Sequence, residues 1–489
     1  MKPRDSGALD ELSRLYGVQA SYRDAFGRER EAPPEALLAI LRALGAEVAA
    51  PGDVPAALAA RRRELAARRV EPVAVAWEGR LDLAVRPPAS RRPPTAWECL
   101  LSLEGGEERR FRLRPEPGAE LASAPGSELA PGAPSGESPH VLHFPESLPL
   151  GYHRLTLRSG RGRARKEARV LVVAAPRTTY GGEIHRSRAW GTFLPLHALA
   201  TAGSWGVGDL ADLERLVGWT AGLGGAVVGA LPLFAAFLGA GEEPYDPSPY
   251  GPASRLFWNE LYLDLGRDLG RDLGSDPTAA AGALPELERS VEARELLGSS
   301  AFEKDLAKLR KSPEVDYRGA MRAKRRLLDA LARELFGSGR RGGLEPRRKE
   351  LEAFRREHAE LDCYAAFRAL TERRGPWQRW APEGAGAGAG STSEGDAAAL
   401  ERAAAADPGA EAARRYHLYA QWLTHRRLHA VAGRAREATG TGLYLDLPLG
   451  VHPSSYDAWR HRELFAQGVS AGAPPDPFFV QGQDWGFQP

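Results

Sequence analysis

Three short apolar runs, set far apart and separated by helical stretches, constrain the fold of this chain more than any other feature. They lie at residues 193–196, 226–231 and 443–447. Leucines and valines at helical spacing over 209–223 separate the first two runs, and mostly helical sequence over 280–432 precedes the third. Strands that are joined through helices pair in parallel, because a crossover returns the chain to the same end of the sheet. The pattern therefore predicts a parallel α/β sheet, with Asp209 as the N-cap of the first helix.

A different pattern precedes the parallel sheet. Residues 8–45 read as two short helices, one of which starts at a proline pair and ends at Gly45. Between about 73 and 173, short apolar runs are punctuated by glycine and proline, and Gly105 with Gly106 is a hairpin signal. This region is predicted to be a β-sandwich.

Two segments of biased composition are predicted to lack regular structure. The first, over 115–139, is rich in Pro, Gly, Ala and Ser and is expected to be a disordered loop of the sandwich. The second is a Gly-Ala repeat over 384–390, which is expected to be a flexible surface insertion.

The chain of 489 residues is too long for one compact domain. We predict an N-terminal helical segment over 1–70, a β-sandwich over 71–176, and over 177–489 the first part of a barrel with a helical insertion at about 266–435. A closed (β/α)8 barrel needs eight strands, and only three candidates are present. The predicted fold class is therefore multidomain: helical segment and β-sandwich, then an incomplete (β/α)8 TIM barrel with large helical insertions.

Composition argues against several classes of partner. The formal net charge of +2 offers no electrostatic basis for binding nucleic acid. No apolar run approaches the roughly 18 residues that span a bilayer, and the first residues lack the apolar core of a signal peptide. Cys99 and Cys363 show no metal-ligand spacing and are predicted to be buried in a reducing compartment. We expect a cytoplasmic protein without nucleic-acid or membrane partners and with unknown oligomeric state.

Acids, aromatics, glycine and proline gather just after the second predicted strand. The segment 245–255 contains Ser248 and Tyr250 between prolines that hold it extended. In a barrel this loop lies on the face where active sites form. An aromatic ring suits the C–H face of a sugar, and hydroxyl groups suit its hydroxyls. The alternative is a proline-stiffened loop whose tyrosines only pack.

Two more clusters have the same character. Asp446 follows the third predicted strand and is expected to face a ligand, because burial of its charge needs partners; a cap or loop role is the alternative. The segment 474–486 combines Asp476, Gln483 and Trp485, which are the parts of a sugar subsite; its alternative is a loop with one packed tryptophan. His452 shows no paired ligand spacing and is predicted to be structural.

In their order along the chain, these clusters resemble the amylomaltase-type 4-alpha-glucanotransferases of glycoside hydrolase family seventy-seven. The N-terminal part, from about residue 9 to 176, resembles the extension of the longer bacterial members. The resemblance implies a (β/α)8 barrel and the transfer of α-1,4-glucan segments between maltooligosaccharides by a retaining double displacement, without metal or organic cofactor. The matching blocks are residues 191–196 with 204–210, 248–259, 446–459 and 474–486.

The resemblance also implies roles for single residues. Ser248 and Tyr250 resemble the loop that contacts bound glucan near the cleavage point, and Asp446 resembles an acid that lines the subsites. Tyr317 resembles a second aromatic platform. The acceptor-side lining is expected to be Asp476, Gln483 and Trp485.

No catalytic residue is assigned. In the family the three catalytic carboxylates lie in strands of Arg-Ile-Asp-His, Ala-Glu-Asp and His-Asp type, and none of these patterns occurs in the sequence. They are expected beyond Pro489. We therefore expect this chain to bind glucan and to be inactive alone; the alternative is a non-catalytic glucan-binding protein.

Overall fold

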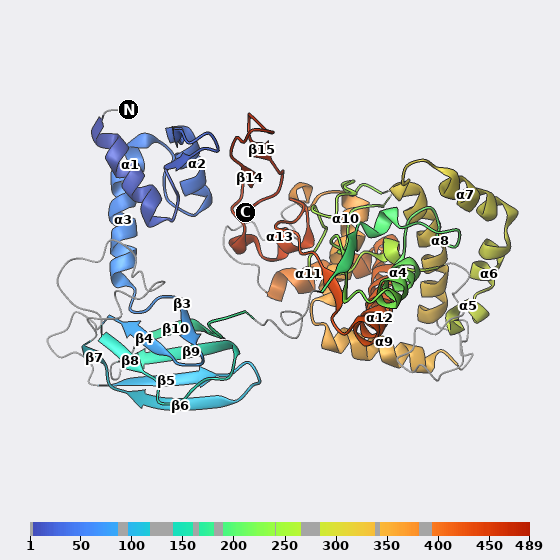
Figure 1. Ribbon diagram of the computed structural model, residues 1–489, viewed down its shortest axis with the longest axis horizontal. Coiled ribbons are helices and arrows are strands. Elements are labelled where there is room, and N and C mark those ends of the chain that lie inside the picture. Colours follow the sequence, from blue (N-terminus) through green and yellow to red (C-terminus); the bar gives the residue numbers. More distant parts are fainter. Residues whose placement is uncertain are drawn as a thin grey trace. The chain divides into compact units, whose positions relative to one another are not determined.

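The computed structural model describes residues 3–86, 96–117, 140–159, 166–179, 189–239, 241–265, 284–337, 343–380 and 394–489. Contacts divide the chain into two compact units, coloured along the sequence in Figure 1. The N-terminal unit comprises Met1–Arg186 with Pro475–Val480, and the sheet–helix unit comprises Ser187–Pro474 with Gln481–Pro489. The domain boundaries predicted from the sequence, after residues 70 and 176, remain predictions.

Three helices open the N-terminal unit: α1 (Pro3–Leu15), α2 (Pro34–Ala43) and α3 (Val54–Ala67). A small antiparallel hairpin, β1 (Ser21–Arg23) with β2 (Glu29–Glu31), lies between the first two. Pro34 opens α2, as the proline pair predicts, since its missing N–H would have no helical partner there. Leucines of all three helices form one core.

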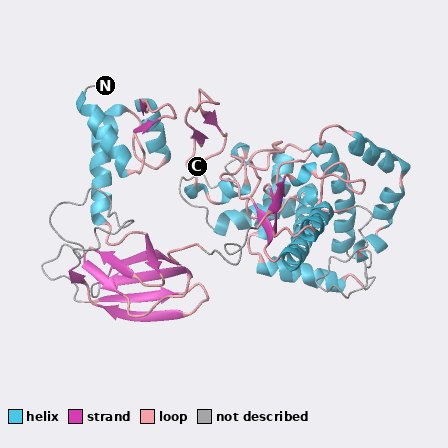
Figure 2. Ribbon diagram, in the orientation of Figure 1, coloured by secondary structure: helices cyan, strands magenta, loops and turns pink. Residues whose placement is uncertain are grey.

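The predicted β-sandwich is present, as two sheets drawn in magenta in Figure 2. Gly106, at a φ of 88°, makes the predicted turn between the two strands at residues 97–102 and 108–113. The inward-facing side chains of both sheets form one core, in which Leu83, Leu101 and Val172 are fully buried. The first sheet has the order β3 (Val73–Trp77), β10 (Lys166–Ala175), β9 (Gly151–Ser159), β5 (Trp97–Ser102) and β6 (Glu108–Leu113), and the second β4 (Asp82–Val85), β8 (His140–His143) and β7 (Glu116–Pro117).

The prediction of a disordered loop over 115–139 is wrong at its start. Glu116 and Pro117 form β7, which pairs with β8, because Pro117 occupies an edge position that needs no donor. Residues 118–139 and the Gly-Ala repeat over 384–390 lie outside the described residues.

The three strands predicted from the apolar runs are present in the sheet–helix unit and pair in parallel, in the order β11 (Gly191–Leu194), β12 (Val227–Ala230), β13 (Gly442–Leu445). Helix α4 (Leu210–Gly222) connects the first two strands, and the Asp209 side chain caps it by accepting from two backbone N–H groups. Helix α12 (Pro408–Thr439) leads into β13. Apolar residues of α4 and α12 pack with Val228 and Ala230 of the central strand.

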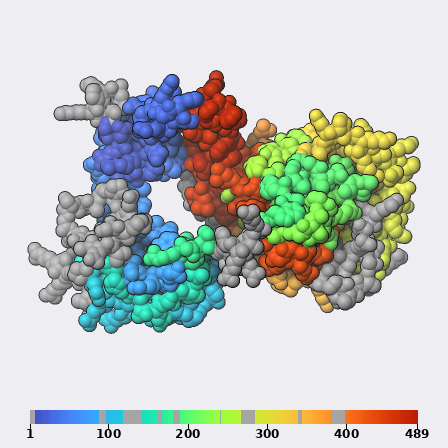
Figure 3. Space-filling view, in the orientation of Figure 1, coloured from blue at the N-terminus to red at the C-terminus, as the bar shows by residue number. Residues whose placement is uncertain are grey.

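The long stretch before β13 is helical, as predicted. Its residues 285–336 form the yellow surface in Figure 3. Within the described residues, no helix combines the length and apolar character needed to cross a bilayer. The helices are α5 (Pro285–Arg289), α6 (Val291–Gly298), α7 (Ser300–Lys311), α8 (Tyr317–Phe336), α9 (Glu345–Glu357), α10 (Leu361–Arg374) and α11 (Glu394–Ala406); after β13 come α13 (Tyr456–Arg460), β14 (Gly472–Ala473) and β15 (Gln483–Asp484).

Candidate functional site

A groove of about 750 Å³ lies beyond the carboxyl ends of β12 and β13 in the sheet–helix unit. We call it the strand-end groove. Loops that follow parallel strands meet at this edge of a sheet, which is where such folds bind ligands. The lining residues come from the loop after β12, the loop after β13 and the C-terminal segment: Asp246, Ser248, Tyr250, Gly251, Leu447, Leu449, His452, Pro453, Trp485, Gly486 and Phe487.

Tyr250 and Asp446 join the two loops across the groove. The Tyr250 hydroxyl donates to Asp446 Oδ2 at 3.0 Å, and the Asp446 backbone N–H donates to the Ala230 carbonyl at the end of β12. Burial and the Asp446 carboxylate raise the pKa of Tyr250 above its ordinary value, so the phenol stays protonated at neutral pH. The pair presents a hydroxyl and a carboxylate at one point.

The loop that carries Ser248 is held by its own side chains. Asp246 Oδ1 accepts from the Ser248 N–H at 2.9 Å, and Ser248 Oγ accepts from the Tyr250 N–H at 3.2 Å. Gly251 lets Asp246 approach closely, since a Cβ here would lie 2.3 Å from Asp246 Oδ2 and would displace that side chain. The loop is therefore ordered before any ligand binds, and the Ser248 hydroxyl keeps its proton for donation.

Aromatic side chains form the other wall of the groove. The rings of Trp485 and Phe487 lie 5.9 Å apart, and Trp485 remains 44% exposed. Phe487 fills the space above Gly450, where a Cβ would lie 2.0 Å from the ring. The Trp485 indole N–H donates to Gln483 Oε1 at 3.3 Å, which fixes the ring through the β14–β15 hairpin. An indole face is thus available for stacking.

His452 is part of the lining, although the sequence indicates only a structural role. Its ring meets Phe237 edge-on at 5.2 Å, and its Nδ1 accepts from the Ser454 N–H at 3.0 Å. Burial lowers the pKa of His452, so the imidazole is neutral at pH 7. Leu447 and Phe487 were also missed; the available signal was their position one and two residues from the predicted Asp446 and Trp485.

Asp446 contacts the lining residue Tyr250 but does not itself line the groove, and the other three predicted site residues do not line it either. Gln483 accepts the hydrogen bond from the Trp485 indole described above. Asp476 lies in the segment counted with the N-terminal unit, where its Oδ1 accepts from the N–H groups of Phe478 and Phe479. Tyr317 opens α8 and meets the ring of His197 at 5.7 Å. The glucan-binding roles of these three residues stay predictions.

Other residues of the predicted blocks act as scaffold. Ser254 is fully buried and donates to Asp457 Oδ1 at 2.5 Å, while the Arg255 N–H donates to Asp457 Oδ2 at 2.9 Å. The Arg255 guanidinium donates to the Leu449 carbonyl at 3.2 Å. These bonds tie the loop after β12 to the loop after β13 and so hold these two loops at a fixed spacing.

The chemistry of the groove suits a polyhydroxylated ring. It offers hydroxyl groups, a carboxylate, a neutral imidazole and aromatic faces, and among the described residues its lining holds neither arginine nor lysine. Across the described ranges, no group of three or more His, Cys, Asp or Glu is placed to hold a metal ion.

Two family models match this chain. The family model of 4-alpha-glucanotransferases of glycoside hydrolase family 77 matches residues 194–489. The model of the MalQ N-terminal β-sandwich domain matches residues 69–176.

Individual proteins are similar along nearly the whole chain. A 4-alpha-glucanotransferase of Mycobacterium tuberculosis is 33% identical over 489 residues, which cover 99% of this chain and 61% of that protein. One of Haemophilus influenzae is 26% identical over 80% of this chain and 51% of its own length. The crystal structure of amylomaltase from Corynebacterium glutamicum superposes with a TM-score of 0.68 and 25% identity, covering 99% of this chain and 60% of that one. The chain thus spans between half and about three fifths of the length of these relatives.

Proposed function

Since the chain belongs to the 4-alpha-glucanotransferase family, glycoside hydrolase family 77, we propose that its strand-end groove binds α-1,4-glucan for transfer between maltooligosaccharides. One observation carries the proposal. The Tyr250–Asp446 hydrogen bond and the exposed Trp485 indole, from three separate loops, converge on one groove. Sugar rings combine hydroxyl groups with an apolar face, which is the combination that these side chains complement.

The proposed reaction is the retaining double displacement. A carboxylate forms a glycosyl–enzyme, and a carboxylic acid protonates the leaving oxygen and then activates the incoming one. The 4-hydroxyl of an acceptor glucan takes the place of water in the second step. In this scheme the groove residues orient the glucan. Ser248 donates to a sugar hydroxyl, the Tyr250 phenol oxygen accepts from one, and Trp485 stacks on a ring. A (β/α)8 barrel built on β11, β12 and β13 is the proposed frame.

The alternative function is glucan binding without catalysis. The prediction that these 489 residues bind maltooligosaccharides without turnover is tested by incubation with maltotriose. Glucose and longer maltooligosaccharides above background would show that the chain is catalytically competent.

Glucan binding in the groove is tested with Trp485→Ala. We expect the affinity of the full chain for maltoheptaose, measured by isothermal titration calorimetry, to fall about ten-fold, because one stacking face is lost. Trp219→Ala is the matched control, since Trp219 is 57% exposed on α4 outside the groove. An unchanged affinity in Trp485→Ala, or an equal loss in the control, rules out the groove as the glucan site.

A further inference from the structure

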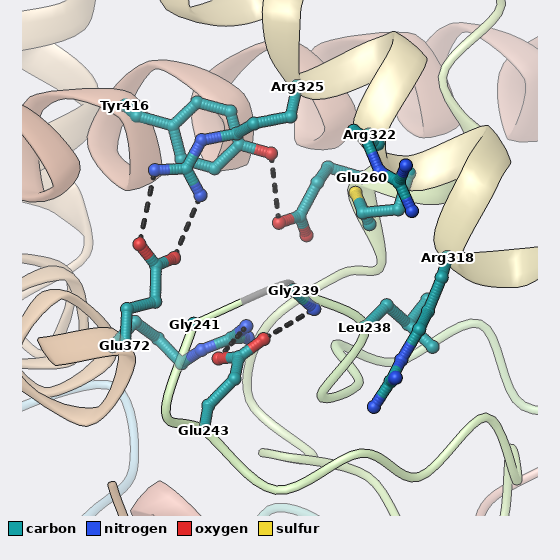
Figure 4. A pocket seen from close by; sticks show the side chains of 12 residues that line it. Leu238, Gly239, Gly241, Glu243, Glu260, Arg318, Arg322, Arg325, Glu372 and Tyr416 are labelled. Atoms are coloured by element: carbon teal, nitrogen blue, oxygen red, sulfur yellow. Dashed lines mark hydrogen bonds and ion pairs between the residues drawn. The ribbon is translucent and has the colours of Figure 1, made fainter. Parts of the chain in front are cut away.

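A second cavity, of about 210 Å³, lies between the loop after β12 and helix α8 (Figure 4). It shares no lining residue with the strand-end groove. Four arginines and three glutamates line it, together with Tyr416 and small or apolar residues. Charged groups are rarely buried unless they have partners, so the partners of each group indicate what the cavity needs.

Two arginines of this cavity are already neutralised. Arg325 bonds both carboxylate oxygens of Glu372, at 2.8 and 3.2 Å, and Arg368 contacts Glu243 at 3.2 Å. Burial raises the pKa of Glu243 to about 7, against the opposing charge of Arg368. These two ion pairs form one wall of the cavity.

The other two arginines lie at the mouth of the cavity. Arg318 and Arg322 are one turn apart on α8, and both are exposed. The Arg318 guanidinium lies 4.0 Å from the Tyr245 ring centroid. Within the described ranges neither arginine pairs with a carboxylate. Guanidinium groups without a carboxylate partner match the oxygens and the charge of a phosphate group.

Inside the cavity, Glu260 has an unused acceptor. The residue is 3% exposed, and its Oε1 accepts from the Tyr416 hydroxyl at 3.3 Å, as Figure 4 shows. No described residue donates to Glu260 Oε2, and none accepts from the buried Nε of Arg368. A buried carboxylate oxygen without a donor costs free energy, so the position calls for an occupant that carries hydroxyl groups.

We propose that this cavity binds a small sugar phosphate, with the phosphate group between Arg318 and Arg322 and a sugar hydroxyl donating to Glu260. The volume corresponds to about seven waters at roughly 30 Å³ each, which accommodates one sugar ring and excludes an oligosaccharide. With four arginines against three glutamates, the lining favours an anion.

Isothermal titration calorimetry of the full chain at constant ionic strength tests this with glucose 6-phosphate, inorganic phosphate and glucose. We expect glucose 6-phosphate to bind at least about ten-fold more tightly than either of the others. Arg318→Gln and Arg322→Gln should each weaken its binding about five-fold or more, because each removes a charged hydrogen-bond donor. Arg326→Gln is the matched control: it lies on the same helix but faces Phe302 and Asp305.

Glu260→Gln tests the contribution of the sugar to binding separately from that of the phosphate. The variant keeps the side-chain shape and should lower the preference for glucose 6-phosphate over phosphate about ten-fold, without weakening phosphate itself. Melting curves establish that each variant folds. Equal binding of phosphate and glucose 6-phosphate, affinities unchanged in both mouth arginine variants, or no saturable heat up to about 10 mM glucose 6-phosphate would each overturn the proposal.

Discussion

At the scale of single residues, buried polar groups in this protein are held by partners far away in the sequence. Lys324 on α8 is fully buried, and its ammonium group donates to the carbonyl of Leu263 at 2.7 Å and to that of Leu261. Burial lowers the pKa of Lys324, while nearby carboxylates, Asp209 foremost, act in the opposite direction. One cation therefore fixes the segment after Glu260 against α8.

Lys324→Met should lower the free energy of unfolding by about 3 kcal/mol, because two buried carbonyls lose their donor. Urea unfolding followed by circular dichroism measures the change. Lys308→Met is the matched control, since Lys308 is exposed on α7. A loss in Lys324→Met no larger than that in the control would show that the two carbonyls find other donors.

At the scale of elements, the end of α9 and helix α12 meet through an edge-on pair of imidazole rings, His358 and His425. The ring of His425 lies 4.1 Å from that of His429 and 4.9 Å from that of His358, which follows α9. Burial, with a smaller contribution from the two neighbouring histidines, lowers the pKa of His425 to about 4. The His425 ring is therefore neutral at pH 7 in the folded chain.

The packing of α9 on α12 should weaken in acid. Between pH 6.5 and about 4 the unfolded chain binds a proton at His425 that the folded chain does not, so acid favours unfolding in this window. His425→Phe should remove this share of the pH dependence while retaining a ring against Phe354. The measurement is the difference in unfolding free energy between the two proteins from pH 8 to pH 4.5. A difference that stays constant over the range contradicts the assignment.

At the scale of the whole molecule, helices α4 and α12 cover one face of the parallel sheet. Val228 and Ala230 face the core that α4 and α12 share. Phe193 and Tyr444 are aligned across Gly229 on the opposite face, and they are 56% and 67% exposed. Among the described residues, β11 and β13 have no further strand beside them, so an apolar face and two open edges are accessible.

We therefore predict that the chain associates with itself as its concentration rises. Light scattering after size exclusion should give an apparent mass that increases with loading concentration. The double variant Phe193→Ser with Tyr444→Ser should reduce this increase, whereas Trp219→Ser, on α4, should not. A mass equal to that of one chain at all concentrations is the outcome that rejects the prediction.

The sequence by itself determined the parts of this protein that depend on near neighbours. Apolar periodicity and turn residues act over a few positions, so they predicted β11, β12, β13, the Asp209 cap and the sandwich strands β3, β4, β5, β9 and β10. The position of Ser248, Tyr250 and Asp446 just after strands was enough to expect them at one edge of the sheet, because parallel strands end at the same edge. Trp485 needed the resemblance to the family.

Only the tertiary structure decided which distant residues meet. Ser254 and Asp457 are 203 positions apart, and Glu260 and Tyr416 are 156 apart. No local pattern encodes such pairs, since they follow from how helices and loops pack once the core has formed. Long-range packing also explains why the sequence indicates only a structural role for His452, although this residue lines the groove. It also explains why the charged cavity beside α8, with its unused Glu260 oxygen, is visible only in three dimensions.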